Sequence, residues 1–210
     1  MDIPFYENTK DDTHCFQAAL RMILKHYWPG KDFSWEELEK ITAKVDGLWT
    51  WPMAGMLWLH DNGFEVHAVE SFDYSKFVDM GGDYLIDLFG QEVGQEQIAQ
   101  SDIAQEVEYA KRIVKAGLCE PRMPEISELK EYLNQKYLIM CNVNSRALNN
   151  KEGYVGHFVV LTGYTSSGFI LHDPGLPPLK NREVTFSDFE RAWAYPNGQA
   201  KNYITVRKTK

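Results

Sequence analysis

Three residues of this chain, Cys15, His157 and Asp173, have the types that a thiol nucleophile requires. A cysteine attacks as the thiolate, and it needs a base and a group that orients the base. Cys15 begins a stretch whose apolar residues recur at helical spacing, and positions 11–13 before it hold cap-type residues. We therefore predict a helix over residues 15–27 with the sulfur in its first turn, where the helix dipole lowers the pKa of a cysteine.

His157 and Asp173 stand at the ends of two strand-like runs, 157–164 and 168–173, joined by a linkage with β-hairpin turn chemistry. A hairpin centred on Thr165 puts the two residues opposite each other, and shifts of one to three residues are equally compatible with the sequence. A carboxylate beside an imidazole favours its charged form, which stabilises a neighbouring thiolate. Taken singly, each residue also has an ordinary interpretation: a small buried thiol, a polar strand end and a turn residue.

The remaining elements form a frame for these residues. Helices are expected over about 34–44, which starts with a capping box, and over about 53–62, 126–135 and 187–193. Strands are expected over residues 64–70, 137–143 and 202–207 as well as the two runs above. Because helices come first and strands later, the fold class is α+β with a mostly antiparallel sheet.

Residues 72–126 differ from their surroundings because they hold eleven acidic and five basic residues, which is −6 of the total formal charge of −8. Their second half has a helical period. We interpret residues 1–210 as a single domain with a helical acidic insertion at about 72–126. The insertion is interpreted as a solvated acidic face or, alternatively, as a substrate lid.

The overall composition narrows the function classes. A net charge of −8 argues against nucleic-acid binding, because phosphates need a basic surface. Three cysteines form no disulfide framework, and no zinc-ligand spacing is present. The start of the sequence lacks a signal-peptide pattern and no apolar run is long enough to span a bilayer, so we expect a cytoplasmic protein. The oligomeric state stays open.

These stretches resemble the double-glycine leader peptidases that process bacteriocins, and their stand-alone relatives in the papain-like clan of cysteine peptidases. The resemblance lies in residues 12–27, 156–164 and 168–174, with weaker matches at 57–66 and 128–133. The family pattern has a nucleophilic Cys at a helix start, a Gly-His pair leading an apolar strand and an Asp-Pro ending the next strand. Cys15, His157 and Asp173 match it one by one. The resemblance covers most of the chain outside 72–126 and implies a papain-like fold, with the nucleophile helix packed on the sheet.

The sequence departs from the family pattern at two places. Phe16 and Gln17 follow the cysteine where the family usually has Gly and Pro, and the usual upstream Gln, which helps to hold the oxyanion, is absent. Asn8 is the nearest amide donor and is the candidate to replace it. Loss of one oxyanion donor typically slows turnover by a factor of ~100 to 1,000.

The resemblance implies a cysteine peptidase that cleaves a peptide or amide bond of a peptide or protein substrate through a thioester, with no cofactor and no metal. Two alternatives stay open: a catalytically weak or inactive domain that binds a peptide or leader, and a thiol-dependent acyltransferase of the transglutaminase type. The other polar and aromatic candidates have ordinary interpretations. We expect His14 in a turn, His172 on the side of its strand opposite Asp173, Cys141 in the core, Cys119 in a linker, and Trp49 and Trp51 in the core or in a cleft wall.

Overall fold

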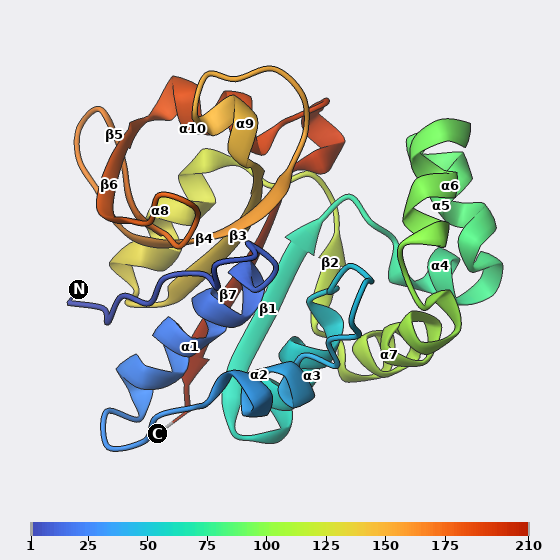
Figure 1. Cartoon of the computed structure of the whole chain (residues 1–210), viewed down its shortest axis with the longest axis horizontal. Coiled ribbons are helices and arrows are strands. Elements are labelled where there is room, and N and C mark those ends of the chain that lie inside the picture. Colours follow the sequence, from blue (N-terminus) through green and yellow to red (C-terminus); the bar gives the residue numbers. More distant parts are fainter. Residues whose placement is uncertain (1, 210) are drawn as a thin grey trace.

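The computed structural model describes residues 2–209, which build one seven-stranded sheet with helices on both faces (Figure 1). The strand order is β2-β1-β7-β3-β4-β5-β6, and every neighbouring pair except the parallel β1–β2 pair is antiparallel. The expected α+β class with a mostly antiparallel sheet is therefore confirmed. The strands are β1 (Phe64–Glu70), β2 (Cys119–Pro121), β3 (Leu138–Asn144), β4 (Gly156–Tyr164), β5 (Gly168–Asp173), β6 (Leu179–Thr185) and β7 (Asn202–Lys208).

The helices divide into three groups along the chain: α1 to α3 before β1, α4 to α7 between β1 and β2, and α8 to α10 after β2. α1, α2 and α3 come first, and α4, α5 and α6 form the lobe to the right in Figure 1. The helices are α1 (Cys15–Tyr27), α2 (Trp35–Ile41), α3 (Met53–Asp61), α4 (Tyr74–Met80), α5 (Gly82–Phe89), α6 (Gln91–Ala99), α7 (Ile103–Ala116), α8 (Ile126–Asn134), α9 (Ser145–Leu148) and α10 (Phe186–Trp193), with a short 3-10 turn at Gly198–Ala200.

Two hydrophobic cores lie on the two faces of the sheet, and strand β4 contributes to both because its side chains alternate. Phe158 and Val160 belong to the core that includes α1, α3, α4 and α7. Val159 and Leu161 belong to the second core, which includes α8 and α10. All four are buried, so β4 reads as a continuous apolar run rather than an alternating one. This buried run anchors β4, in which His157 is the second residue.

Residues 72–126 hold α4 to α7, and strand β2 follows α7. β2 pairs in parallel with the end of β1, so the last part of this segment joins the sheet. The lobe is also tied to the Trp-rich loop before α3: the Trp49 N–H donates to the Gln100 carbonyl (2.8 Å) and Trp51 Nε1–H donates to Ser101 Oγ (2.9 Å). Trp51 further stacks on Phe77 of α4, with ring centroids 5.4 Å apart. The lobe and the loop therefore share one apolar cluster.

Strand β6, the short strand β2 and helix α9 were not expected from the sequence. β6 is an edge strand whose side chains are mostly exposed and include three charged residues, so it carries no apolar alternation. α9 is a single turn capped by Asn144, whose side chain accepts from the Arg146 N–H. Within residues 2–209, no helix is both long and apolar enough to cross a membrane.

Candidate active site

Cys15 is the first residue of α1, as expected, and its side chain is half-buried. His14 occupies the N-cap position and makes no side-chain cap hydrogen bond to the helix. The cap-type residues at 11–13 do not cap because they are used within their own loop: Asp12 accepts from Asn8, and the Thr13 hydroxyl bonds His14 Nδ1. Without a side-chain cap, the first N–H groups of α1 stay available for negative charge beside the sulfur.

His157 and Asp173 are joined by a hydrogen bond of 2.7 Å between Nε2 and Oδ1, and both side chains are buried. The register of the β4–β5 hairpin differs by two residues from the symmetric one, since Val160 pairs with His172 and a bulge follows Leu161. The two residues are therefore diagonal rather than opposite neighbours, a separation that a long side chain spans. Because Nε2 faces the carboxylate, Nδ1 is the ring atom left for a nucleophile.

Cys15 and His157 influence each other's protonation. Burial alone would raise the pKa of Cys15, but the side chain and charge of His157 and the backbone of Phe158 bring it below its ordinary value. Burial would lower the pKa of His157, yet Asp173 and Cys15 raise it well above its ordinary value. Asp12 is the opposing charge, because it raises the pKa of the thiol. A thiol with a lowered pKa beside an imidazole with a raised pKa is the combination that favours a thiolate–imidazolium pair.

Asp173 is held by more partners than the sequence suggested. Oδ1 accepts from the Gly175 N–H (3.0 Å) as well as from His157, and Oδ2 accepts from Arg182 Nη1 (2.8 Å). Burial raises the pKa of Asp173, but the imidazole, the Gly175 N–H and the Arg182 guanidinium together lower it. The carboxylate is therefore ionised at neutral pH, as a group that orients a histidine must be.

Gly175 and Arg182 were missed in the sequence because each needs three-dimensional knowledge. A Cβ on Gly175 would lie 3.0 Å from Asp173 Oδ1 and 3.3 Å from two atoms of the His157 ring, so any side chain here would press on the His157–Asp173 pair, and glycine avoids that contact. The Asp-Pro-Gly run was a detectable signal for Gly175, although it reads equally well as a turn. Arg182 lies in β6, whose exposed pattern gives no sign of a buried ion pair.

Asn8, the candidate oxyanion donor, is buried and its side chain staples the loop before α1. Its Oδ1 accepts from the His14 N–H and the Thr9 N–H (both 2.8 Å), while Nδ2 donates to Asp12 Oδ1 (2.7 Å). Its backbone N–H donates to the Pro174 carbonyl, which follows Asp173 directly. One amide hydrogen remains without a partner inside the described part of the chain. Asn8 thus lies just before the first turn of α1, but most of the hydrogen-bonding capacity of its side chain is used within its own loop.

The two other histidines near these residues have internal roles. His14 Nε2 bonds Glu39 Oε1 (2.7 Å) and Nδ1 bonds the hydroxyls of Thr9 and Thr13, so it clamps its loop to α2. His172 points away from Asp173, as expected, and bonds the Ile3 carbonyl (3.0 Å). Neither ring is free to serve as a second base.

The other thiols and the tryptophans divide between core and surface. Cys141 is fully buried, as expected. Cys119 lies in strand β2 rather than in a linker, and burial raises the pKa of its thiol. Trp51 belongs to the core cluster, whereas Trp49 is 47% exposed. Cys15 is thus the thiol whose surroundings favour the reactive form.

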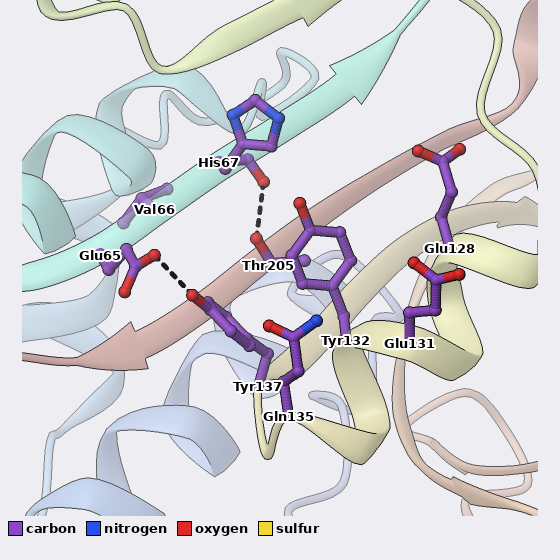
Figure 2. Close-up of a pocket in the computed structure, with 9 residues that line it drawn as sticks. All are labelled: Glu65, Val66, His67, Glu128, Glu131, Tyr132, Gln135, Tyr137 and Thr205. Atoms are coloured by element: carbon purple, nitrogen blue, oxygen red, sulfur yellow. Dashed lines mark hydrogen bonds between the residues drawn. The ribbon is translucent and has the colours of Figure 1, made fainter.

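A separate groove of about 580 Å³ lies between α8 and strands β1 and β7 (Figure 2). Its walls mix polar and apolar surface and contain no residue of the Cys15 site. Two of its glutamates are already paired, Glu65 with Tyr137 and Arg207, and Glu128 with Arg122. Among residues 2–209, no group of three histidine, cysteine or acidic side chains is arranged to hold a metal ion.

Comparisons with known proteins agree with this architecture. The family described as "Peptidase_C39 like family" matches residues 1–201. No curated protein matches the chain. The peptidase domain of Streptococcus ComA, a bifunctional ABC transporter involved in quorum sensing, has a similar fold, with a TM-score of 0.54, 14% identity and coverage of 97% of each chain. A double-glycine motif protease of an AMS/PCAT transporter, solved with its leader peptide, gives a TM-score of 0.51 at 13% identity, covering 99% of this chain and 93% of that one.

Proposed function

The chain belongs to the peptidase C39-like family, and from that premise we propose that it is a cysteine peptidase whose catalytic residues are Cys15, His157 and Asp173. The observation that carries the proposal is the buried 2.7 Å bond between His157 and Asp173, with the uncapped N-terminus of α1 and its thiol beside the imidazole. This arrangement supplies a nucleophile, a proton carrier and an orienting carboxylate.

The proposed reaction is acyl transfer to water. The Cys15 thiolate attacks the carbonyl carbon of a peptide bond, and the backbone N–H of Cys15 stabilises the oxyanion. The imidazolium of His157 gives its Nδ1 proton to the leaving amine, the C–N bond breaks, and a thioester remains. His157 then takes a proton from water, whose oxygen attacks the thioester and releases the carboxylate product and the thiolate. Asp173 keeps the ring oriented through both steps.

The proposed substrate is a peptide or protein. One structural neighbour was solved with a leader peptide, and its fold is shared by this chain. We extend the peptide class to this protein, and we assign no preference for particular residues beside the cleaved bond. The transglutaminase-like alternative differs in the acceptor, so an added primary amine would appear in the product if it were correct.

One observation favours the second candidate, a weak or inactive peptide-binding domain. Asn8, which stands nearest to the missing oxyanion Gln, already holds Asp12 and the His14 backbone. If Asn8 contributes to the oxyanion site, Asn8→Ala lowers turnover about 100- to 1,000-fold with little effect on Cys15 alkylation. If it is a loop staple, alkylation and turnover fall together, because the loop that carries the thiol loosens. Thr9→Val is the matched control, since it removes hydroxyl hydrogen bonds to Asp11 and His14 from the same loop without changing a charge or the Asn8 amide.

The deciding experiment measures iodoacetamide alkylation of each cysteine at pH 6 by peptide mass spectrometry. The wild type should alkylate rapidly at Cys15 and slowly at Cys119, whose thiol has a raised pKa. His157→Ala should abolish the rapid reaction, because the thiolate loses its counter-charge. In a second measurement, the wild type is incubated with a peptide substrate and quenched with acid. A thioester on Cys15 should then appear as a mass gain equal to the acyl fragment. Equal alkylation of wild type and His157→Ala would reject the proposed triad.

A further inference from the structure

Arg182 makes two internal hydrogen bonds, both short. Nη1 donates to Asp173 Oδ2 (2.8 Å) and Nη2 donates to the Leu148 carbonyl (2.7 Å). Its side chain is 16% exposed and that of Asp173 is 5% exposed, so the ion pair is largely shielded from water. The guanidinium thus ties the carboxylate, at the end of β5, to the last residue of α9, which leads into the loop before His157.

The strand pairing explains how Arg182 reaches this position. Leu171 pairs with Arg182, but Asp173 pairs with Leu179, so β6 has one extra residue between the two pairs. Asn181, at the bulge, has a φ of 53°, in the left-handed region. Leu171 and Asp173 lie on the same face because side chains alternate along a strand, and the partner of Leu171 therefore lies diagonal to the carboxylate. The bulge aims a charged residue of an edge strand inward.

We infer that Arg182 is a positioning residue: it holds Asp173 in the orientation that His157 needs and, through its charge, limits how strongly Asp173 retains a proton on the imidazole. This inference rests on the proposed function. An unopposed buried carboxylate would make the imidazolium a poor acid, which gives its proton to a leaving amine slowly. A guanidinium on the far oxygen offsets part of that negative charge.

The charges around the pair give the direction of the effect. Cys15 faces His157 and Asp12, His157 faces Cys15 and Asp173, and Asp173 faces His157 and Arg182. Removing the Arg182 guanidinium, which stays charged at every pH tested, makes the net charge around Cys15, His157 and Asp173 more negative. Both the thiol and the imidazole should then keep their protons to a higher pH.

The test is the pH profile of Cys15 alkylation by iodoacetamide, between pH 4 and pH 10. The acid limb of this profile is the pH range in which the alkylation rate rises as the Cys15 thiol loses its proton. In Arg182→Met, the midpoint of the acid limb should move up by roughly half a pH unit to one unit, as expected for loss of a nearby charge. Arg182→Gln, which keeps an amide donor but no charge, should move it equally and serves if the methionine variant does not fold. Arg182→Lys should leave the limb near its wild-type position and lower the rate.

Arg191 provides the matched control. It also bonds a carboxylate, Asp188, and an α9 carbonyl, that of Ala147, but it does not touch Asp173. Arg191→Met should lower thermal stability without moving the limb. An unmoved limb in both neutral Arg182 variants would overturn the inference while leaving the peptidase proposal intact. A wild-type Cys15 that reacts no faster than a free thiol would overturn both.

Discussion

Two regions of this molecule bury carboxyl groups, and the pKa of the buried acid is lowered in one region and raised in the other. Asp173 is surrounded by an imidazole, a backbone N–H and a guanidinium, and these partners lower its pKa despite burial. Glu70, at the end of β1, and Glu106, on α7 beside the lobe of α4 to α6, lack such partners, and burial raises the pKa of both, that of Glu106 to about 7. Glu70 accepts one hydrogen bond from Tyr74 (2.7 Å). Glu106 Oε2 is buried with no partner within residues 2–209.

The difference shows that burial alone does not decide the charge of an acid in this fold. His157 in β4, Arg182 in β6 and the Gly175 N–H between β5 and β6 lower the pKa of Asp173, so that it is ionised at neutral pH, which suits a group that orients a histidine. The lobe supplies only a phenol to Glu70 and, for Glu106, the further repulsion of Asp102. A fall in pH should therefore reduce the contribution of Asp173 to the free energy of unfolding, whereas a rise in pH should reduce the contributions of Glu70 and Glu106.

The largest expected effect comes from Asp173→Asn, which breaks the first half of this comparison. It leaves the partly buried Arg182 without its counter-charge and should lower the free energy of unfolding by about 3 kcal/mol. Thermal melts should show a midpoint about 6–12 °C lower. Alkylation of Cys15 at pH 6 should slow at least tenfold, because the imidazolium loses its support. A variant as stable and as reactive as the wild type would contradict the assigned role.

The next effect tests the second half. The pKa of Glu106 is raised above its unfolded value, so the folded state binds the proton more tightly. The contribution of Glu106 to stability is therefore fully present below about pH 4.5 and falls as pH rises to about 7, by about 1–2 kcal/mol after allowance for partial exposure. Glu106→Gln should remove this fall. Melts at pH 5 and pH 8 measure it, with the exposed Glu108→Gln on the same helix as control. An equal fall in wild type and Glu106→Gln would count against the buried acid.

For Asp173 the sign is reversed. Its pKa is lowered in the folded state, so its contribution to stability is present above pH 3.8 and is lost as pH falls through the lower folded value. His157 adds stability below its ordinary pKa of 6.5, and this is lost as pH rises through the higher folded value. A melt series in the Glu106→Gln background should isolate these two contributions at the acid and alkaline ends.

The smallest expected effect comes from Tyr74→Phe, which sharpens the comparison within the lobe. Glu70 would lose the hydrogen bond that its Oε1 accepts, and its pKa should rise further. We expect a loss of about 1 kcal/mol near neutral pH and less at pH 4, where the acid is protonated in both states. Tyr109→Phe on α7 is the control. Identical losses at both pH values would show that the phenol packs but does not support the carboxylate.

The helix of Cys15, the capping box of Ser34 and strand β1 were predictable because each depends on short-range pattern. His157 and Asp173 could be named as candidates for the same reason, although their two-residue offset could not, since it depends jointly on where the turn lies and on a bulge inside the hairpin. Arg182 was beyond reach. Its place depends on a second bulge in a strand with no apolar pattern, and no local sequence rule relates it to Asp173.

The two hydrogen bonds between the Trp-rich loop and residues 100–101 bear on any attempt to shorten this protein. The same loop carries Thr50, whose hydroxyl lies 3.5 Å from Gln17 Nε2, two residues after the nucleophile. A truncated chain lacking residues 74–116 would leave the indole of Trp51 without Ser101 and without the ring of Phe77. A shortened protein would therefore need new side chains to cover Trp51, because excision alone would expose its indole in the loop that contacts the first turn of α1.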